Sequence, residues 1–92
     1  MIIRILGEGQ LNVPDQHEAE LNRLDDAVTA AVTAAQEMAY QQSLAQLLAR
    51  VRAIGTPLPD DELTASDAIL PAEDTSLAEV RALLGEQGLI PG

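Results

Sequence analysis

The spacing of apolar residues changes at Pro14, and this change constrains the fold more than any other feature of the sequence. Before it, residues 1–13 contain two short extended runs, and the first of them, residues 2–6, is apolar at nearly every position. After it, residues 15–54 place apolar side chains every three or four positions, which is the spacing of an amphipathic helix. A change from period 2 to period 3.6 predicts an α+β domain.

The two extended runs are joined by Gly-Glu-Gly at residues 7–9, which predicts a β-hairpin in which Gly9 takes a positive φ. Leu11 and Val13 form one apolar face of the second strand. The first strand is apolar on both faces, so we expect both of them to be covered. Because an isolated two-stranded ribbon is marginal in water, another segment must extend or cover this hairpin.

Residues 15–54 carry two apolar stripes that differ in phase by two positions, and the shift falls near Gln36–Met38. A single helix over this range would be roughly 60 Å long at ~1.5 Å per residue, with its apolar face twisted half-way along. The shift favours a helical hairpin with a turn near Gln36 and Glu37, while one long helix remains the alternative. The stripes consist of Leu21, Leu24, Val28, Ala31 and Ala35, and of Tyr40, Leu44, Leu47, Leu48, Val51 and Ile54.

Local signals mark the ends of the expected helices. Asp15 and Glu18 have the spacing of a capping box at the start of the helical hairpin, and Gly55 is placed to end it. Ser76 and Glu79 have the same capping-box spacing at the start of a short C-terminal helix.

Residues 56–74 contain three prolines and six acidic residues but no basic residue, so they hold −6 of the formal net charge of −10. Five apolar residues interrupt this segment, which a purely solvated linker would not need. We interpret it as an ordered, extended acidic arm with a short strand at Ala68–Leu70, and a flexible acidic linker is the alternative. The five apolar residues are Leu58, Leu63, Ala68, Ile69 and Leu70.

Residues 76–84 predict a short C-terminal helix, and the apolar Leu89 and Ile90 beyond it are expected to dock on the body. The expected whole is one small domain over residues 1–92. In it the N-terminal β-hairpin packs with the helical hairpin and the C-terminal helix, and the acidic arm lies between them. The apolar face of the C-terminal helix consists of Leu77, Val80, Leu83 and Leu84.

The charge of the chain argues against some classes of ligand. The chain has 15 acidic residues and five arginines but no lysine, which argues against direct binding to nucleic acid or anionic lipid. The absence of cysteine excludes a disulfide framework and a thiolate nucleophile. No apolar run is long enough for a transmembrane helix or the core of a signal peptide, so we expect a cytoplasmic protein.

No constellation of residues points to an enzyme, a cofactor or a metal site. His17 is the only histidine, and it lacks the partners and spacing of a metal site, so we expect it to be solvated. Residues 7–9 lack the third glycine and the following helix of a dinucleotide-binding loop. Residues 60–62 with Asp67 lack the order of a calcium-binding EF-hand.

Alanines cover a wide arc of the first expected helix. Their ordinary role is packing within the domain, but small side chains also allow a helix from a partner to approach closely. These residues are Ala27, Ala30, Ala31, Ala34 and Ala35.

The chain resembles the PspA-associated protein family, PspAA, over essentially its whole length. The resemblance rests on Met-Ile-Ile-Arg-Ile-Leu-Gly-Glu-Gly-Gln at 1–10, Val-Pro-Asp at 13–15, Leu-Asn-Arg-Leu-Asp-Asp at 21–26, Leu-Leu-Ala-Arg-Val-Arg at 47–52, Gly-Thr-Pro-Leu-Pro-Asp-Asp-Glu-Leu at 55–63, Ser-Asp-Ala-Ile-Leu-Pro at 66–71 and Leu-Leu-Gly-Glu-Gln-Gly-Leu-Ile-Pro-Gly at 83–92. One departure is the junction of the two helices, where the family pattern leads us to expect a glycine or aspartate turn and residues 34–37 have neither.

The resemblance implies a small accessory protein, without catalytic residues, that binds or regulates PspA, the coiled-coil protein of the phage-shock response to envelope stress. Membrane contact is then expected only indirectly, through the partner. We expect the acidic arm to provide the contact, with aspartates for charge and apolar residues for burial. The alternative is a small-ligand or metal-binding sensor that uses the same arm. The expected partner-binding residues are Leu58, Asp60, Asp61, Leu63, Asp67 and Ile69.

The first strand also predicts self-association, most simply as a twofold dimer, because an exposed apolar edge strand is usually paired or covered. The competing possibility is internal, with Ala68–Leu70 or Leu89–Ile90 adding a third strand. The residues expected at the dimer interface are Ile2, Ile3, Ile5 and Leu6.

Overall fold

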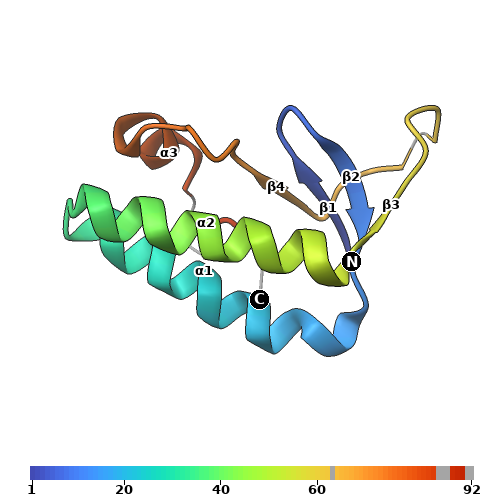
Figure 1. Ribbon diagram of the computed structural model, residues 1–92, viewed down its shortest axis with the longest axis horizontal. Helices are drawn as coiled ribbons and strands as arrows, with labels where there is room; N and C mark the ends of the chain where they lie inside the picture. The colour runs from blue at the N-terminus through green and yellow to red at the C-terminus, as the bar shows by residue number, and fades with distance from the viewer. Residues whose placement is uncertain (63, 85–87, 91–92) are drawn as a thin grey trace.

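A small mixed sheet lies against a pair of antiparallel helices in the computed structural model, which describes residues 1–62, 64–84 and 88–90 (Figure 1). The elements in chain order are β1 (Ile2–Ile5), β2 (Gly9–Asn12), a 3-10 turn (Asp15–His17), α1 (Glu18–Thr33), α2 (Glu37–Ile54), β3 (Thr56–Pro57), β4 (Ala68–Leu70) and α3 (Leu77–Leu83). The α+β architecture predicted from the sequence is confirmed. No helix in these described ranges is long and apolar enough to span a membrane.

The N-terminal β-hairpin is formed by β1 and β2, which pair antiparallel with Ile3 opposite Leu11. Gly7 and Gly9 have φ values of +86° and +117°, so the turn uses backbone conformations that residues with a Cβ rarely adopt. The prediction of a hairpin with Gly9 at a positive φ is therefore confirmed.

The acidic arm supplies both outer strands of the sheet. Its first part, β3, pairs antiparallel with β2, and its last part, β4, pairs parallel with β1, giving the order β3-β2-β1-β4. The residues between β3 and β4 must therefore pass from one edge of the sheet to the other. Gln10 of β2 holds this crossing segment, because its buried side-chain amide donates to Thr64 O at 2.6 Å and to Ser66 Oγ at 2.8 Å.

The two-faced apolar strand predicted at residues 2–6 is not observed. Ile3 and Ile5 point into the core and are fully buried, whereas Arg4 and Leu6 between and beyond them are exposed. β1 has no free edge, since β2 pairs with it on one side and β4 on the other. The sheet is extended internally by Ala68–Leu70, so the argument for a dimer through this strand is removed.

The helices form the predicted hairpin, and the turn between them falls at residues 34–36. Ala35 takes the left-handed conformation with φ +54°, and Gln36 N donates to Ala31 O at 3.0 Å. An alanine thus occupies a backbone conformation that usually favours glycine or asparagine. Because alanine fills this position, the sequence of the turn contains neither glycine nor aspartate.

Two predicted helix-end signals behave differently from expectation. The capping box of Asp15 and Glu18 is absent, because a 3-10 turn precedes α1 and neither helical segment has a side-chain cap there. Gly55 ends α2 in an extended conformation rather than a left-handed one. Position 55 requires glycine because neighbouring atoms approach its backbone closely. A Cβ there would lie 2.7 Å from Val51 O and 2.9 Å from Leu11 Cβ.

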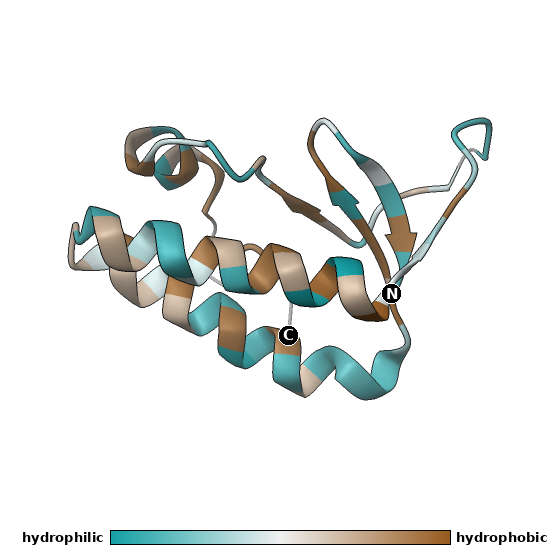
Figure 2. Ribbon diagram, in the orientation of Figure 1, coloured by the Kyte–Doolittle hydropathy of each residue, from teal (hydrophilic) through white to brown (hydrophobic). Residues whose placement is uncertain are grey.

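The core lies between the sheet and the helical hairpin, and Figure 2 shows hydrophobic segments in β1, β4 and both long helices. Tyr40 is the only aromatic residue and is 1% exposed, with its hydroxyl donating to Thr75 O at 2.6 Å. Aliphatic side chains provide the rest of the burial. The largest fully buried ones are Ile3, Ile5, Leu21, Leu44, Leu47, Leu48, Leu70 and Ile90.

The C-terminal helix begins with the predicted capping box, in which Glu79 N donates to Ser76 Oγ at 3.1 Å. The apolar face predicted for this helix is wrong in one respect, because Val80 is buried but Leu83 is exposed. Leu89 and Ile90 are buried against the body, as predicted.

Candidate partner-binding surfaces

The six residues predicted to bind a partner do not form one patch. Asp60 and Asp61 are exposed in the loop that follows β3, whereas Ile69 is half-exposed on β4 at the opposite edge of the sheet (Figure 1). Asp67 serves the fold, because its carboxylate accepts from Ile2 N at 2.7 Å.

Leu58 and Leu63 complete the predicted set. Leu58 is partly buried and its backbone N–H donates to Gln10 O at 2.9 Å, which anchors the start of the crossing segment. Leu63 lies outside the described residues. Asp60 and Asp61 are therefore the charged members of the set that stay available on the surface.

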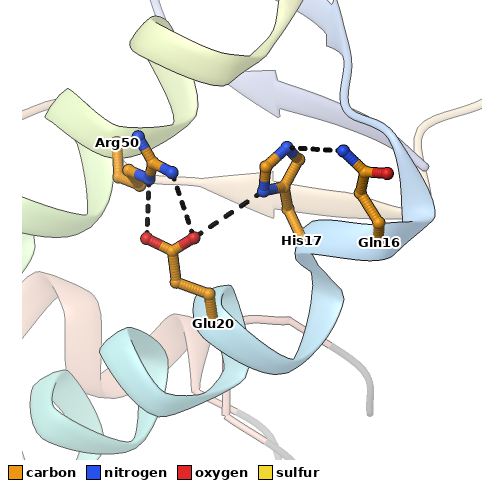
Figure 3. Close-up of polar contacts among 4 residues, drawn as sticks. All are labelled: Gln16, His17, Glu20 and Arg50. Atoms are coloured by element: carbon orange, nitrogen blue, oxygen red, sulfur yellow. Dashed lines mark hydrogen bonds and ion pairs between the residues drawn. The ribbon is translucent and has the colours of Figure 1, made fainter.

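Two ion-pair clusters join segments that are distant in the sequence. Figure 3 shows the first, in which Arg50 of α2 makes a two-pronged contact with Glu20 of α1 at 2.6 and 3.2 Å. His17 Nδ1 lies 3.7 Å from the same carboxylate, so this histidine is partly buried beside an acid rather than solvated as predicted. The hydrogen bond from Arg50 lowers the pKa of Glu20, and His17 contributes in the same direction. The cluster braces the open end of the helical hairpin.

The second cluster is centred on Arg52 at the end of α2. Its Nε donates to Glu8 Oε1 at 2.9 Å, and its Nη1 donates to Glu73 Oε1 at 3.4 Å. The hydrogen bond from Arg52 lowers the pKa of Glu8, and the same bond raises the pKa of Arg52. These contacts tie the β1–β2 turn and the segment after β4 to α2. Arginines that the sequence shows as isolated charges are thus used to hold the fold together.

A groove of about 450 Å³ runs between α2 and the segment before α3, and all of its charged lining residues are acidic. Glu73 on its rim is paired with Arg52, whereas Glu37 and Asp74 have no ion-pair partner among the described residues. The described ranges contain no group of three or more histidine, cysteine or acidic residues arranged to hold a metal ion. The unpaired carboxylates of Glu37 and Asp74 make the groove negatively charged. The lining residues are Glu37, Gln41, Ala45, Glu73, Asp74, Thr75 and Ser76.

A comparison with family models matches residues 1–92 to PspAA, the PspA-associated protein. The chain belongs to this family. The resemblance noted in the sequence is thereby confirmed over the whole chain, and the family name indicates association with PspA. Searches of the curated proteins and of the solved structures each found no significant match.

The acidic groove was missed by reasoning from the sequence. Glu37, Gln41 and Ala45 lie four residues apart on one side of α2, which is a signal the sequence does contain. The opposite wall, residues 73–76, reaches this position only because β4 pairs with β1. That pairing depends on contacts between residues more than 60 positions apart, which no local pattern reveals.

Proposed function

We propose that this member of the PspAA family is a non-enzymatic accessory protein that binds PspA and regulates it in the phage-shock response to envelope stress. The observation that carries the proposal is the family match, which covers every residue of the sequence. The proposal places the protein in the cytoplasm, with membrane contact only through its partner.

The surface charge supports a protein partner with basic residues. The net charge is −10, and three of the five arginines make contacts inside the domain: Arg50, Arg52 and Arg81, whose Nη2 donates to Val32 O at 3.1 Å. The acidic groups on the surface therefore outnumber the available cations. Such a surface attracts basic partners and speeds their association at low salt.

Within the acidic arm, Asp60 and Asp61 are the proposed electrostatic contact. Both are exposed, and no ion pair engages either of them among the described residues. Charges at the rim of an interface act mainly on the association rate. Replacing both by asparagine is expected to slow association with PspA and to reduce its dependence on salt.

The experiment is a binding measurement between the purified chain and purified PspA from the same organism, by biolayer interferometry at low and moderate salt. The expected result is saturable binding that weakens as salt rises. Absence of binding at tens of micromolar protein in low salt would refute the proposed function.

A further inference from the structure

The charged residues are distributed unevenly along the chain. Of 15 acidic and five basic residues, only Glu37 falls between Ala27 and Ala49. This stretch covers the second half of α1, the turn and the first two-thirds of α2. Many of its side chains are exposed, so the depletion of charge is a property of the surface and not only of the core.

The outward side of α2 shows this depletion most clearly. Met38, Gln42, Gln46, Ala49 and Ala53 are all exposed and lie on the side of the helix away from the buried stripe. Met38 is 75% exposed, the highest value among the large hydrophobic residues that the structure describes. With the partly exposed Ala45, the positions 38, 42, 45 and 49 follow the 4-3-4 spacing of a coiled-coil contact.

The second half of α1, which packs against α2, also has small exposed side chains near the turn that joins the two helices. Ala27, Ala30 and Ala34 are exposed and present only methyl groups. Small side chains on one helix allow another helix to approach closely. We call this surface the outer helix face, and it consists of Ala27, Ala30, Ala34, Met38, Gln42, Gln46 and Ala49.

The acidic groove borders the outer helix face directly, because Glu37, Gln41 and Ala45 form one wall of the groove and lie beside Met38 and Gln42 on α2. An uncharged surface with an acidic border is complementary to a helix that has an apolar stripe with lysine or arginine beside it. Interface centres are depleted of charge and enriched in methionine, while charged residues gather at their rims.

We propose that the outer helix face binds an amphipathic helix of PspA, an inference that rests on the proposed function. In this complex, a lysine or arginine beside the apolar stripe of the PspA helix enters the acidic groove. From position 38 to position 49, α2 offers about 16 Å of contact at ~1.5 Å per residue, or roughly three turns. A partner helix of about 12 residues would cover it.

A second copy of this chain fits the surface less well. Two copies meeting through this face would bring their acidic grooves together, and like charges across an interface oppose association. Among the described residues, the arginines without an ion pair are Arg4 on the sheet, Arg23 on α1 and Arg81 on α3, and none of them lines the groove. The surface therefore lacks the cation that the groove is suited to bind.

The first test introduces one charge into the outer helix face. Ala49→Glu adds a carboxylate to the outer helix face, and Ala82→Glu adds the same group at an exposed position of α3 as a matched control. Both positions are helical and exposed, so both variants are expected to keep the wild-type circular dichroism spectrum. We expect Ala49→Glu to weaken binding to purified PspA at least tenfold, and Ala82→Glu to change it less than twofold.

The second test compares the effects of the groove and of the acidic arm on binding, using variants that change the net charge equally. The double variant Glu37→Gln/Asp74→Asn alters the groove, and Asp60→Asn/Asp61→Asn alters the arm, and each removes two negative charges. We expect the groove pair to raise the dissociation rate several-fold. The arm pair is expected to lower the association rate only.

The outcomes distinguish the two proposals. If wild-type protein does not bind PspA, the proposed function fails and this inference fails with it. If wild type binds and Ala49→Glu binds as tightly as Ala82→Glu, the function stands and the outer helix face is not the binding site. A dimer mass by light scattering that Ala49→Glu converts to a monomer mass would also overturn the inference, because the face would then bind a second copy.

Discussion

Removal of the Asp25 carboxylate is expected to destabilise the domain strongly, although the sequence around it does not predict that it is buried. Asp25 lies on α1 and is 2% exposed. Its Oδ1 accepts from Leu89 N at 3.1 Å and its Oδ2 accepts from Ile90 N at 2.9 Å, so one side chain fastens the C-terminal tail to the helical hairpin. Gly88 permits this approach, because a Cβ there would lie 2.7 Å from Asp25 Oδ2.

The expected loss of stability follows from the two backbone N–H groups that donate to Asp25. Asp25→Ala leaves two buried backbone N–H groups without acceptors, at about 1–3 kcal/mol each. Removing a buried negative charge offsets part of this loss, so we expect a decrease of about 2–4 kcal/mol in the free energy of unfolding. In a domain of this size that corresponds to a fall of roughly 10–25 °C in Tm.

The pH dependence follows from the pKa of the same carboxyl. Burial raises the pKa of Asp25, although the hydrogen bonds from Ile90 and Leu89 lower it, and the net shift is upward. The native state therefore binds this proton more tightly than the unfolded state does. The resulting stabilisation is complete below the unfolded pKa of ~3.9 and is lost as pH rises through the higher folded-state pKa. We expect the wild-type advantage over Asp25→Ala to be larger at pH 4 than at pH 7.

The assay is urea unfolding followed by circular dichroism at both pH values. Asp26→Ala is the matched control, because Asp26 is the neighbouring residue on α1, is exposed, and has no ion-pair partner among the described residues. We expect the control to stay within about 0.5 kcal/mol of wild type. Equal unfolding midpoints for the two variants would show that the tail contributes nothing to stability through Asp25.

Three further substitutions test how the remaining segments are held. Gly55→Ala is expected to cost about 1–3 kcal/mol in urea unfolding, because the new Cβ would meet Val51 O at 2.7 Å, and an unchanged midpoint would contradict the close approach. Gln10→Ala is expected to cost about 1–2 kcal/mol and to speed hydrogen exchange in β3 and β4, since it removes two hydrogen bonds to the crossing segment. Tyr40→Phe removes one hydrogen bond, to Thr75 O, and is expected to cost about 1 kcal/mol by the same measurement.

Features that depend on neighbouring residues could be predicted from the sequence. The β-hairpin follows from Gly9, and the start of α3 follows from Ser76 and Glu79 three residues later. The helical hairpin follows from a phase shift within one continuous segment. Each signal concerns residues within a few positions of each other, where backbone preference and side-chain spacing decide the structure.

Features that depend on distant pairs could not be predicted in the same way. Arg50 and Glu20 are 30 positions apart, and Asp25 and Ile90 are 65 positions apart. The acidic arm shows the consequence for the candidate site. Its residues are contiguous in the sequence, and the arm as a whole was predicted to contact the partner, but the arm crosses the sheet and its two ends lie at opposite edges.

Buried polar side chains hold the non-helical segments of this domain to an aliphatic core. Gln10 fastens the crossing segment, Asp25 fastens the tail and Tyr40 fastens the residues before α3. A core without phenylalanine or tryptophan buries less apolar area per side chain. Hydrogen bonds from these three side chains therefore help to fix the positions of the non-helical segments. All three side chains are at most 8% exposed, and none of them belongs to the outer helix face. A helix docking on that face would break none of these bonds, so we expect it to bind a preformed surface, with single-phase association kinetics.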